Sequence, residues 1–141
     1  MYHKVIIVGN LGRDPEMRYT PDGTPVTNFS VATNRRWTNQ DGSQGEETVW
    51  FRVTAWRRLA EVCNQYLSKG RQVLVEGRLQ PDSATGGPRV YQRNDGSYGA
   101  QFEIVANTVK FLGSRGEAAP DIAATNTFPE PPPEPEEEIP F

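Results

Sequence analysis

The sequence has almost none of the residues that catalytic and metal-binding sites use most. It contains one cysteine, Cys63, and one histidine, His3, among 141 residues. A lone cysteine cannot form an internal disulfide bond, which is typical of a reducing compartment. One histidine and one cysteine provide neither a zinc site nor a nucleophile paired with a base. The sequence therefore predicts no enzyme activity, no metal and no cofactor.

Long hydrophobic segments are also missing. No run of about eighteen apolar residues occurs, so the sequence predicts no membrane-spanning helix. The amino-terminal segment has an apolar run of only four residues, Val5 to Val8, which is shorter than the apolar part of a secretory signal. We therefore expect a cytoplasmic protein.

Positive charge is absent from the last part of the chain. Residues 117–141 contain no Lys or Arg and seven Asp and Glu, a net charge of −7. Residues 1–116 contain all 15 Lys and Arg and 11 Asp and Glu, a net charge of +4. The net charge of −3 for the whole chain therefore hides a mildly basic body and an acidic tail. This asymmetry predicts nucleic-acid binding by the body and a protein-docking or solvating role for the tail.

The body does contain short β-type segments separated by turns. Alternating or β-branched composition marks five segments, with Pro, Gly, Asp and Asn between them. They are residues 3–12, 26–37, 48–56, 71–79 and 90–111. Within the last segment, Asn94-Asp95-Gly96 is typical of a hairpin turn. Five strands of this kind predict an all-β fold, a small β-barrel.

One helix is predicted after the third strand. Leu59, Val62, Cys63 and Tyr66 recur at the spacing of one apolar helix face. Gly70 follows at a position that favours a left-handed cap. We expect Cys63 to be packed against the body and inert.

The composition changes again near residue 116. The segment that follows is rich in Pro and Glu, and its apolar residues are scattered. Such a segment cannot bury enough apolar surface to offset the entropy of ordering, so we expect a disordered carboxyl-terminal tail. We divide the chain into a body, residues 1–113, a linker, residues 114–135, and an acidic tip, residues 136–141.

The segment Thr48–Trp56 carries the functional prediction. Successive side chains of a strand point to opposite faces. One set of alternate residues, from Val49 to Ala55, is apolar and suits a barrel interior. The other set holds Trp50, Arg52 and Trp56. Two indoles and a guanidinium on an outer face favour a flat, negatively charged ligand, such as single-stranded nucleic acid.

Aromatic residues stand beside arginines elsewhere in the body. Stacking on aromatic rings requires no particular base, so we expect binding that tolerates any sequence and weakens with salt. Tyr98 is equally compatible with an ordinary cross-strand pair. The candidate DNA-binding residues are Trp37, Trp50, Trp56, Tyr91, Arg35, Arg36, Arg52, Arg57, Arg58 and Arg93.

Trp37 raises a problem of strand parity. With perfect alternation from Val26, it shares the face of Phe29 and Val31, which suit the core. A bulge or bend near residues 33–35 would turn it outward, and without one it would be a core residue. Exposure of Trp37 is the hypothesis that we favour, but alternation alone does not decide it.

Longer motifs of the chain resemble those of the bacterial single-stranded DNA-binding proteins. The family's opening strand and turn are similar to VGNLGRDPEMRYTPDG. Further matches occur in the family's order and spacing, namely NRRW, ETVWFRVTAW, RLAEVCNQYLSKGRQVLVEGRL and GAQFEIVANTVKFLG. The resemblance implies a five-stranded oligonucleotide-binding barrel (OB-fold) with one helix after the third strand, and a homotetramer.

The resemblance also implies roles for the aromatic residues. Trp37, Trp50 and Trp56 look like three platforms on which bases stack, with tryptophan at the third, where phenylalanine is common. Tyr91 falls where a fourth platform, often tryptophan, is expected. The loop before it, residues 81–89, is longer than is usual in the family.

The end of the chain resembles the family's acidic tip. In that family the terminal phenylalanine enters an apolar pocket of replication and repair proteins, and its carboxylate meets basic residues. The resemblance implies a nucleoid-associated protein that coats single strands in DNA replication, recombination and repair and recruits partner enzymes. The docking residues would be Glu136, Glu137, Glu138, Ile139, Pro140 and Phe141.

Three other functions are left open by the sequence. The barrel could belong to a primosomal accessory protein or an RNA-binding module, although these usually lack an acidic tip ending in phenylalanine. A nuclease would need a metal cluster, which the acids of the body, lying largely in turns and loops, do not form. The tail could also carry the main function, with the barrel serving only as its platform.

Overall fold

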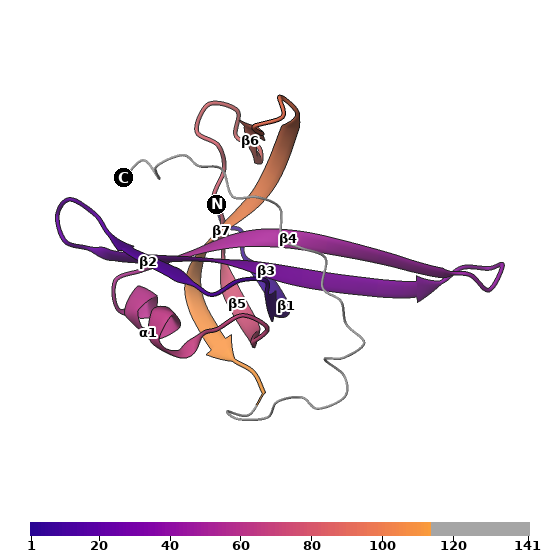
Figure 1. Ribbon diagram of the computed structural model, residues 1–141, viewed down its shortest axis with the longest axis horizontal. Helices are drawn as coiled ribbons and strands as arrows, with labels where there is room; N and C mark the ends of the chain where they lie inside the picture. The colour runs from indigo at the N-terminus through magenta and orange to yellow at the C-terminus, as the bar shows by residue number, and fades with distance from the viewer. Residues whose placement is uncertain (114–141) are drawn as a thin grey trace.

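The computed structural model describes residues 1–113. Seven strands and one helix follow one another along this part of the chain (Figure 1). They are β1 (Val5–Leu11), β2 (Glu16–Tyr19), β3 (Pro25–Thr38), β4 (Gln44–Trp56), α1 (Arg58–Tyr66), β5 (Gln72–Leu79), β6 (Arg89–Gln92) and β7 (Tyr98–Phe111). In residues 1–113 no helix has the length and apolar character needed to cross a membrane.

Five of the strands form a closed barrel. Hydrogen-bonded neighbours run in the order β1-β5-β7-β4-β3, and β1 also pairs with β3, which closes the circle. All of these pairs are antiparallel except β4 with β7, which is parallel. The helix α1 follows β4, the third barrel strand, and packs against β3 and β4. The predicted all-β OB-fold barrel with one helix after the third strand is therefore confirmed.

Two short strands accompany the five barrel strands, and only β2 lies outside the predicted segments. β2 pairs with the beginning of β3, and β6 pairs with the beginning of β7. β2 lies in a segment dominated by turn residues, where a strand forms because a partner is adjacent and not because of its own composition. β6 lies at the start of the predicted segment 90–111 and is the first strand of its predicted hairpin. Each one lengthens a hairpin at the edge of the barrel.

Alternate apolar side chains fill the barrel interior. Every barrel strand contributes, and α1 adds Cys63. Removing a Val or Phe side chain from water stabilises the fold by roughly 1.5–3 kcal/mol. A buried hydrogen bond of 2.7 Å from the Thr27 hydroxyl to the Ala60 carbonyl ties α1 to β3. The core residues include Ile7, Leu11, Phe29, Val31, Val53, Ala55, Val73, Val75 and Ile104.

The end of α1 differs from the prediction. The helix ends at Tyr66, and Leu67 is already extended, so Gly70 does not cap it. Gly70 does have a positive φ of 85°, but it serves a later turn. Its N–H donates to the Leu11 carbonyl at 2.8 Å, which links the exit of the helix to β1.

Two arms extend beyond the barrel. β3 and β4 stay paired from Val26–Trp56 out to Thr38–Gln44 with no shift in register, and this arm runs to the right in Figure 1. β6 and the beginning of β7 form a second arm above the barrel. The hairpin turn predicted at residues 94–96 is confirmed, because the Arg93 N–H donates to the Ser97 carbonyl at 2.7 Å.

Three hairpin tips are closed by the same arrangement. In each, the carboxylate of an Asp that precedes a positive-φ Gly accepts a hydrogen bond from the backbone N–H two residues later. Bonds from Thr and Ser hydroxyls also hold the pKa of each Asp carboxyl below its usual value. The acceptor–donor pairs are Asp22 with Thr24 (3.3 Å), Asp41 with Ser43 (2.9 Å) and Asp95 with Ser97 (2.9 Å). The hydroxyls that donate to the three carboxylates are those of Thr20, Ser43 and Ser97.

Candidate nucleic-acid interface

Strand β4 presents its alternate residues as the sequence predicts. Val53 and Ala55 are buried in the interior. On the opposite face Trp50 is half-buried and Trp56 is 37% exposed. We call this side of β4 the outer sheet face. Both indoles therefore have surface on the outside of the barrel, where a base can stack.

Strands β6 and β7 continue the outer sheet face. The parallel register of β4 and β7 places Glu103 beside Arg52. The antiparallel register of β6 and β7 places Arg89 opposite Gln101. Positions 101 and 103 are two residues apart on β7, so their side chains point to the same side of the sheet. One surface thus leads from the second arm to Trp56.

Arg52 is not the exposed cation that alternation suggested. It points to the outer sheet face, but only 7% of its surface is exposed. Its register neighbours are Ser30 on β3, which is also buried, and Glu103 on β7. Because β4 has a partner strand on each side, a long side chain at its centre has neighbours on both flanks. The expected exposure of Arg52 is wrong, and its contact with DNA stays a prediction.

Trp37 leaves the core without the bulge that we considered. The pairing of β3 with β4 is continuous, so Trp37 keeps the parity of Phe29 and Val31. Residues 26–32 of β3 are buried on both faces, whereas residues 34–36 are exposed. The strand simply outruns the barrel, and the Trp37 indole is half-buried on the first arm. Strand length, not a change of parity, gives the indole its exposed surface.

The Trp37 ring is held by its neighbours. Its Nε1–H donates to Asn39 Oδ1 at 3.0 Å. The guanidinium carbon of Arg35 lies 5.1 Å from the ring centroid, within the range of a cation–π contact. The arrangement places a positive charge beside an aromatic platform, as stacking of a base and pairing with its phosphate require.

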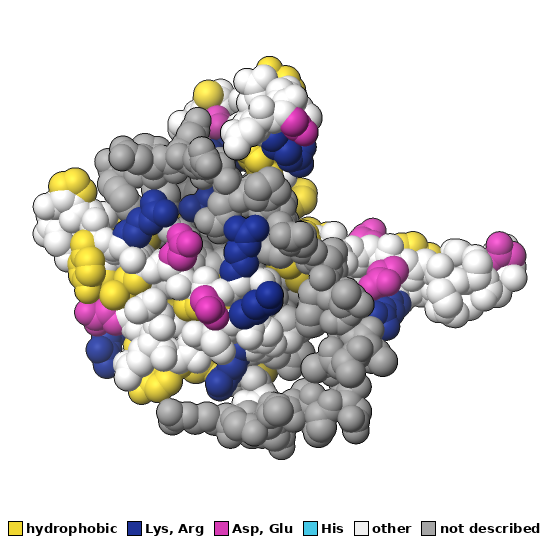
Figure 2. Space-filling model, in the orientation of Figure 1, with side chains coloured by type: hydrophobic (Ala, Val, Ile, Leu, Met, Phe, Trp, Pro, Cys, Tyr) yellow, Lys and Arg dark blue, Asp and Glu magenta, His cyan; other side chains and the backbone are white. Residues whose placement is uncertain are grey.

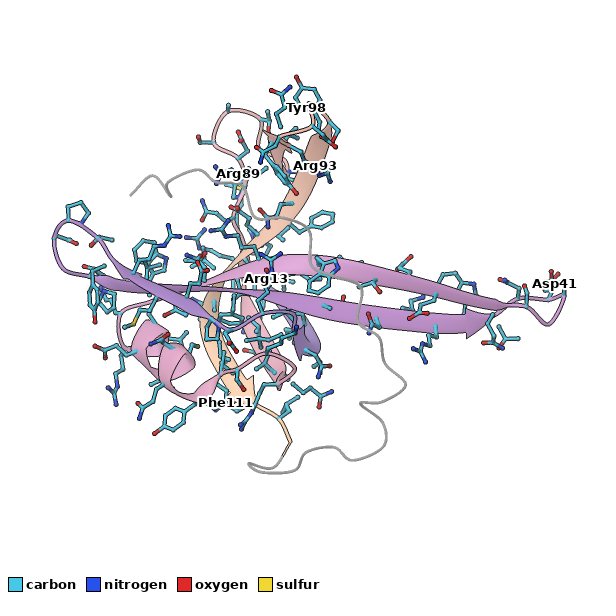
Figure 3. All side chains as sticks on the ribbon, viewed as in Figure 1. Arg13, Asp41, Arg89, Arg93, Tyr98 and Phe111 are labelled. Carbon is cyan, nitrogen blue, oxygen red and sulfur yellow. The ribbon has the colours of Figure 1, made fainter. Side chains whose placement is uncertain are left out.

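The second arm exposes Tyr98 instead of Tyr91. Tyr91 is 8% exposed, and its ring packs over Gly99, where an added Cβ would come within 2.8 Å of Cζ. Tyr98 is 70% exposed and lies at the outer end of the arm (Figure 3). The sequence left the exposure of Tyr91 open, and the ring is buried because it fills the space left by a partner without a side chain. The predicted role of Tyr91 as a stacking platform stays a prediction. On this arm Tyr98 is the aromatic residue with an accessible ring.

Arg93 stabilises the same arm. Its guanidinium carbon lies 5.7 Å from the Tyr91 ring centroid. Its Nη1 donates to the Tyr98 carbonyl at 2.8 Å and to Ser97 Oγ at 3.3 Å. These contacts give Arg93 a structural role, and its predicted contact with DNA is untested.

Two of the candidate arginines form exposed ion pairs. Arg36 Nε lies 3.4 Å from Glu46 Oε1, and Arg58 Nη1 lies 3.4 Å from Glu61 Oε2. Exposed pairs of this kind contribute only about 0.2–1 kcal/mol. A phosphate group can therefore compete with either carboxylate. Lys and Arg side chains are spread over the barrel face in Figure 2, with Asp and Glu among them.

Arg57 has an unusual backbone. Among residues 1–113 it is the one non-glycine residue with positive φ, at φ 59° and ψ −126°. It precedes α1, and its N–H donates to the Pro25 carbonyl at 2.9 Å. A non-glycine residue in such a conformation costs of order 1–3 kcal/mol. The strained junction places a guanidinium directly after the exposed indole of Trp56, and both residues line a hollow beside the β2–β3 tip.

Trp56 also borders a hollow of about 430 Å³, which we call the Trp56 pocket. Arg89 Nη1 lies 3.9 Å from Glu103 Oε1 at this pocket, and the two side chains are only 20% and 16% exposed. The sequence carries no signal for this pair, because only the β6–β7 register brings the two residues together. The pocket is lined by Thr54, Trp56, Gln80, Pro81, Asp82, Ser83, Arg89, Val90, Glu103 and Val105.

Cys63, possible metal ligands and the predicted tail remain to be placed. Cys63 is buried, and burial raises the pKa of its thiol to about 12, so the thiolate nucleophile is disfavoured. In the described part of the chain no three His, Cys, Asp or Glu side chains cluster as metal ligands. The predicted linker and the docking residues Glu136 to Phe141 lie outside the described residues.

Comparison with known proteins identifies relatives of this architecture. The model of the family described as the single-strand binding protein family matches residues 2–112. A single-stranded DNA-binding protein of Neisseria meningitidis serogroup A is 48% identical over 115 residues, which are 82% of this chain and 62% of the relative. One from Wolinella succinogenes is 43% identical over 116 residues, with 82% and 67% covered. The chain thus spans less than two thirds of the length of the Neisseria relative.

A solved structure has the same fold. It is the Plasmodium falciparum SSB in complex with ssDNA, and the two chains superpose with a TM-score of 0.63. Their sequences are 26% identical, and the match covers 80% of this chain and 96% of the other.

Proposed function

The chain belongs to the single-strand binding protein family, and from this premise we propose that it binds single-stranded DNA without catalysing a reaction on it. The observation that carries the proposal is the outer sheet face, where Trp50 and Trp56 have accessible surface and the exposed Arg57 directly follows Trp56. Stacking a base on an aromatic ring stabilises a complex by about 1–3 kcal/mol and tolerates any sequence. Arginines pair with phosphates, so the affinity falls as salt is added.

The two arms extend the proposed binding surface beyond the barrel. On the first arm the proposed stacking platform is Trp37. On the second arm it is Tyr98, in place of Tyr91, which was predicted from the sequence. By strand alternation Trp37 and Tyr98 point to the side opposite the outer sheet face, so a bound strand would cross that face and pass around each arm to reach them. The arginines proposed to contact phosphates are Arg35, Arg36, Arg52, Arg57, Arg58 and Arg93.

The proposed cellular role comes from the likeness to the single-strand binding protein family. The protein would coat and protect single strands exposed in DNA replication, recombination and repair, in the cytoplasm and at the nucleoid. The acidic tip, residues 136–141, would recruit partner enzymes, because it combines three glutamates with the apolar residues Ile139 and Phe141, which a merely solubilising segment does not need.

We also propose that the chain assembles as a homotetramer. Ile6 and Val8 of β1 support this, because they are 57% and 46% exposed on the outside of the barrel. Neighbouring exposed apolar side chains of this kind favour contact with another protein surface. Light scattering on the full chain would give the mass of the assembly directly.

Tryptophan fluorescence tests the proposed binding. Adding oligo(dT) at low salt should quench the emission strongly, because stacked bases contact Trp50 and Trp56. The same titration at higher salt should give a weaker affinity, with a slope of about −0.7 per phosphate contact for a single strand. Failure of oligo(dT) to bind at low salt would contradict the proposal.

Competition separates DNA from RNA as the ligand. No feature of the outer sheet face selects for a 2′-hydroxyl. An RNA should therefore compete for the protein no better than a single-stranded DNA of the same length. A strong preference for RNA would favour an RNA-binding module instead.

A further inference from the structure

The Trp56 pocket contains a charge that simple stacking does not require. Glu103 carries a carboxylate on a surface that we propose binds an anionic strand. Its side chain is 16% exposed, and its Oε1 lies 3.9 Å from Arg89 Nη1. That distance is too long for a hydrogen bond, so the pair is a charge contact that leaves lone pairs of the carboxylate able to accept.

The other walls of the pocket suit a flat ring. Trp56 provides aromatic surface, and Pro81, Val90 and Val105 provide apolar surface. The volume of about 430 Å³ falls within the usual range for small-molecule sites. The pocket therefore combines a surface on which a ring can stack with the Arg89–Glu103 ion pair in its wall.

The second acid of the pocket is already engaged in its own loop. Asp82 Oδ1 accepts hydrogen bonds from the backbone N–H groups of Ala84 at 2.8 Å and Thr85 at 3.3 Å. Glu103 is therefore the carboxylate better placed to accept a hydrogen bond from a bound ring.

We propose that the Trp56 pocket binds guanine in preference to the other bases. The base stacks on Trp56, its N1–H and N2–H groups donate to the Glu103 carboxylate, and its O6 accepts from Arg89. This inference rests on the proposed function, because it requires a single strand on the outer sheet face. It adds one position of base preference to binding that is otherwise tolerant of sequence.

The chemistry of the base edges explains the choice. An ionised carboxylate only accepts hydrogen bonds, so it matches two adjacent donors best. The Watson–Crick edge of guanine has two adjacent donors. Thymine has a single N–H between two carbonyl oxygens, and adenine and cytosine each place a ring-nitrogen acceptor beside their amino group. These acceptors would face the Glu103 carboxylate and repel it.

Substituted oligonucleotides test the preference with the unmodified protein. We would compare oligo(dT) with the same strand carrying dG, dC, dA or deoxyinosine at its centre. The dG strand should bind about tenfold more tightly than the dT strand, the order of discrimination that a bidentate contact gives. Deoxyinosine, which lacks the N2 amino group, should lose most of this gain. Equal affinity for dG and dT, or for dG and deoxyinosine, would overturn the inference.

A pair of variants tests the role of Glu103. E103Q should abolish the preference for dG while binding of oligo(dT) stays the same or tightens. E76Q is the matched control, because Glu76 on β5 is likewise paired with a cation, Lys4, at 3.3 Å and lies outside the pocket. It removes the same charge and should leave the preference intact. If E103Q still prefers dG, the assignment to Glu103 fails.

The two proposals fail in different ways. If oligo(dT) does not bind at all, the proposed function is wrong. If oligo(dT) binds and the identity of the central base has no effect, only the guanine pocket is wrong.

Discussion

The indole of Trp37 packs directly over Gly45, its cross-strand partner on the first arm. A Cβ at Gly45 would come within 2.2 Å of the ring carbon Cε2. Tyr91 has the same relationship with Gly99 on the second arm. On each arm a large ring thus covers a position without a side chain, and the glycine determines where the ring lies.

Replacing Gly45 by alanine should therefore displace Trp37. The fold should survive, because the arm lies beyond the barrel, but the affinity for oligo(dT) should fall by about fivefold or more if one stacked base is lost. G87A is the control, since an added Cβ there would meet only Thr85 Oγ1 at 3.7 Å. Fluorescence titration of both variants measures the effect. Unchanged affinity in G45A would show that Trp37 does not act as a platform.

Arg57 should show a trade-off between stability and binding. R57G relieves the positive-φ strain and should be more stable than R57A by about 1–3 kcal/mol. Both variants lose the guanidinium, so both should bind single strands more weakly, with a salt slope reduced by about 0.7. Denaturant unfolding and DNA titration at two salt concentrations give the two quantities.

R57K completes this comparison. It retains the charge and the strain, so it should resemble the unmodified protein more than R57G does in both assays. If R57G bound DNA as tightly as the unmodified protein, the guanidinium would have no role in binding.

The two tyrosines of the second arm should respond differently to truncation. Y91A should lower the free energy of unfolding by about 3 kcal/mol, because a buried ring is lost. Y98A should leave stability unchanged and weaken binding of oligo(dT) by about fivefold or more. Thermal melting and titration of each variant measure both effects, with Y98F as the control that keeps the ring. Weak binding by Y91A without any loss of stability would return the platform role to Tyr91.

Removal of the acidic tip should separate DNA binding from recruitment. A chain lacking residues 136–141 should bind single strands as well as before or more tightly, because an anionic segment no longer competes for the basic surface. Its capture of purified replication or repair proteins should be lost. F141A keeps the acidic residues and should lose recruitment without any gain in DNA affinity. Loss of DNA binding on truncation would contradict this division of roles.

The barrel could be predicted well from the sequence, because strands and helices leave patterns among residues that are close together in the chain. Alternation in residues 48–56 and helical spacing from Leu59 to Tyr66 are properties of neighbouring residues, and they identified the interior face and α1. Gly70 was misassigned because a left-handed glycine fits a helix cap and a later turn equally well.

The binding surface was harder to predict because exposure depends on partners that are distant in sequence. Arg52 is buried between the strands on either side of β4. The Tyr91 ring is buried because it packs over Gly99 of β7, which has no side chain. Trp37 escapes the core only because β3 is longer than the barrel. Arg89 and Glu103 gave no signal at all, since an ion pair across two strands is visible only once the register is known.

The common closure of the three hairpin tips links the stiffness of both arms to acidity. Each tip depends on an ionised aspartate whose pKa is lowered in the folded chain. That stabilisation is complete above the unfolded carboxyl pKa, near 3.8, and is lost as the pH falls through the lower folded values. At neutral pH the arms are thus preorganised, and DNA would bind them without first ordering their ends. In strong acid the three aspartates would all be protonated, and the hairpin tips would lose these hydrogen bonds to a carboxylate.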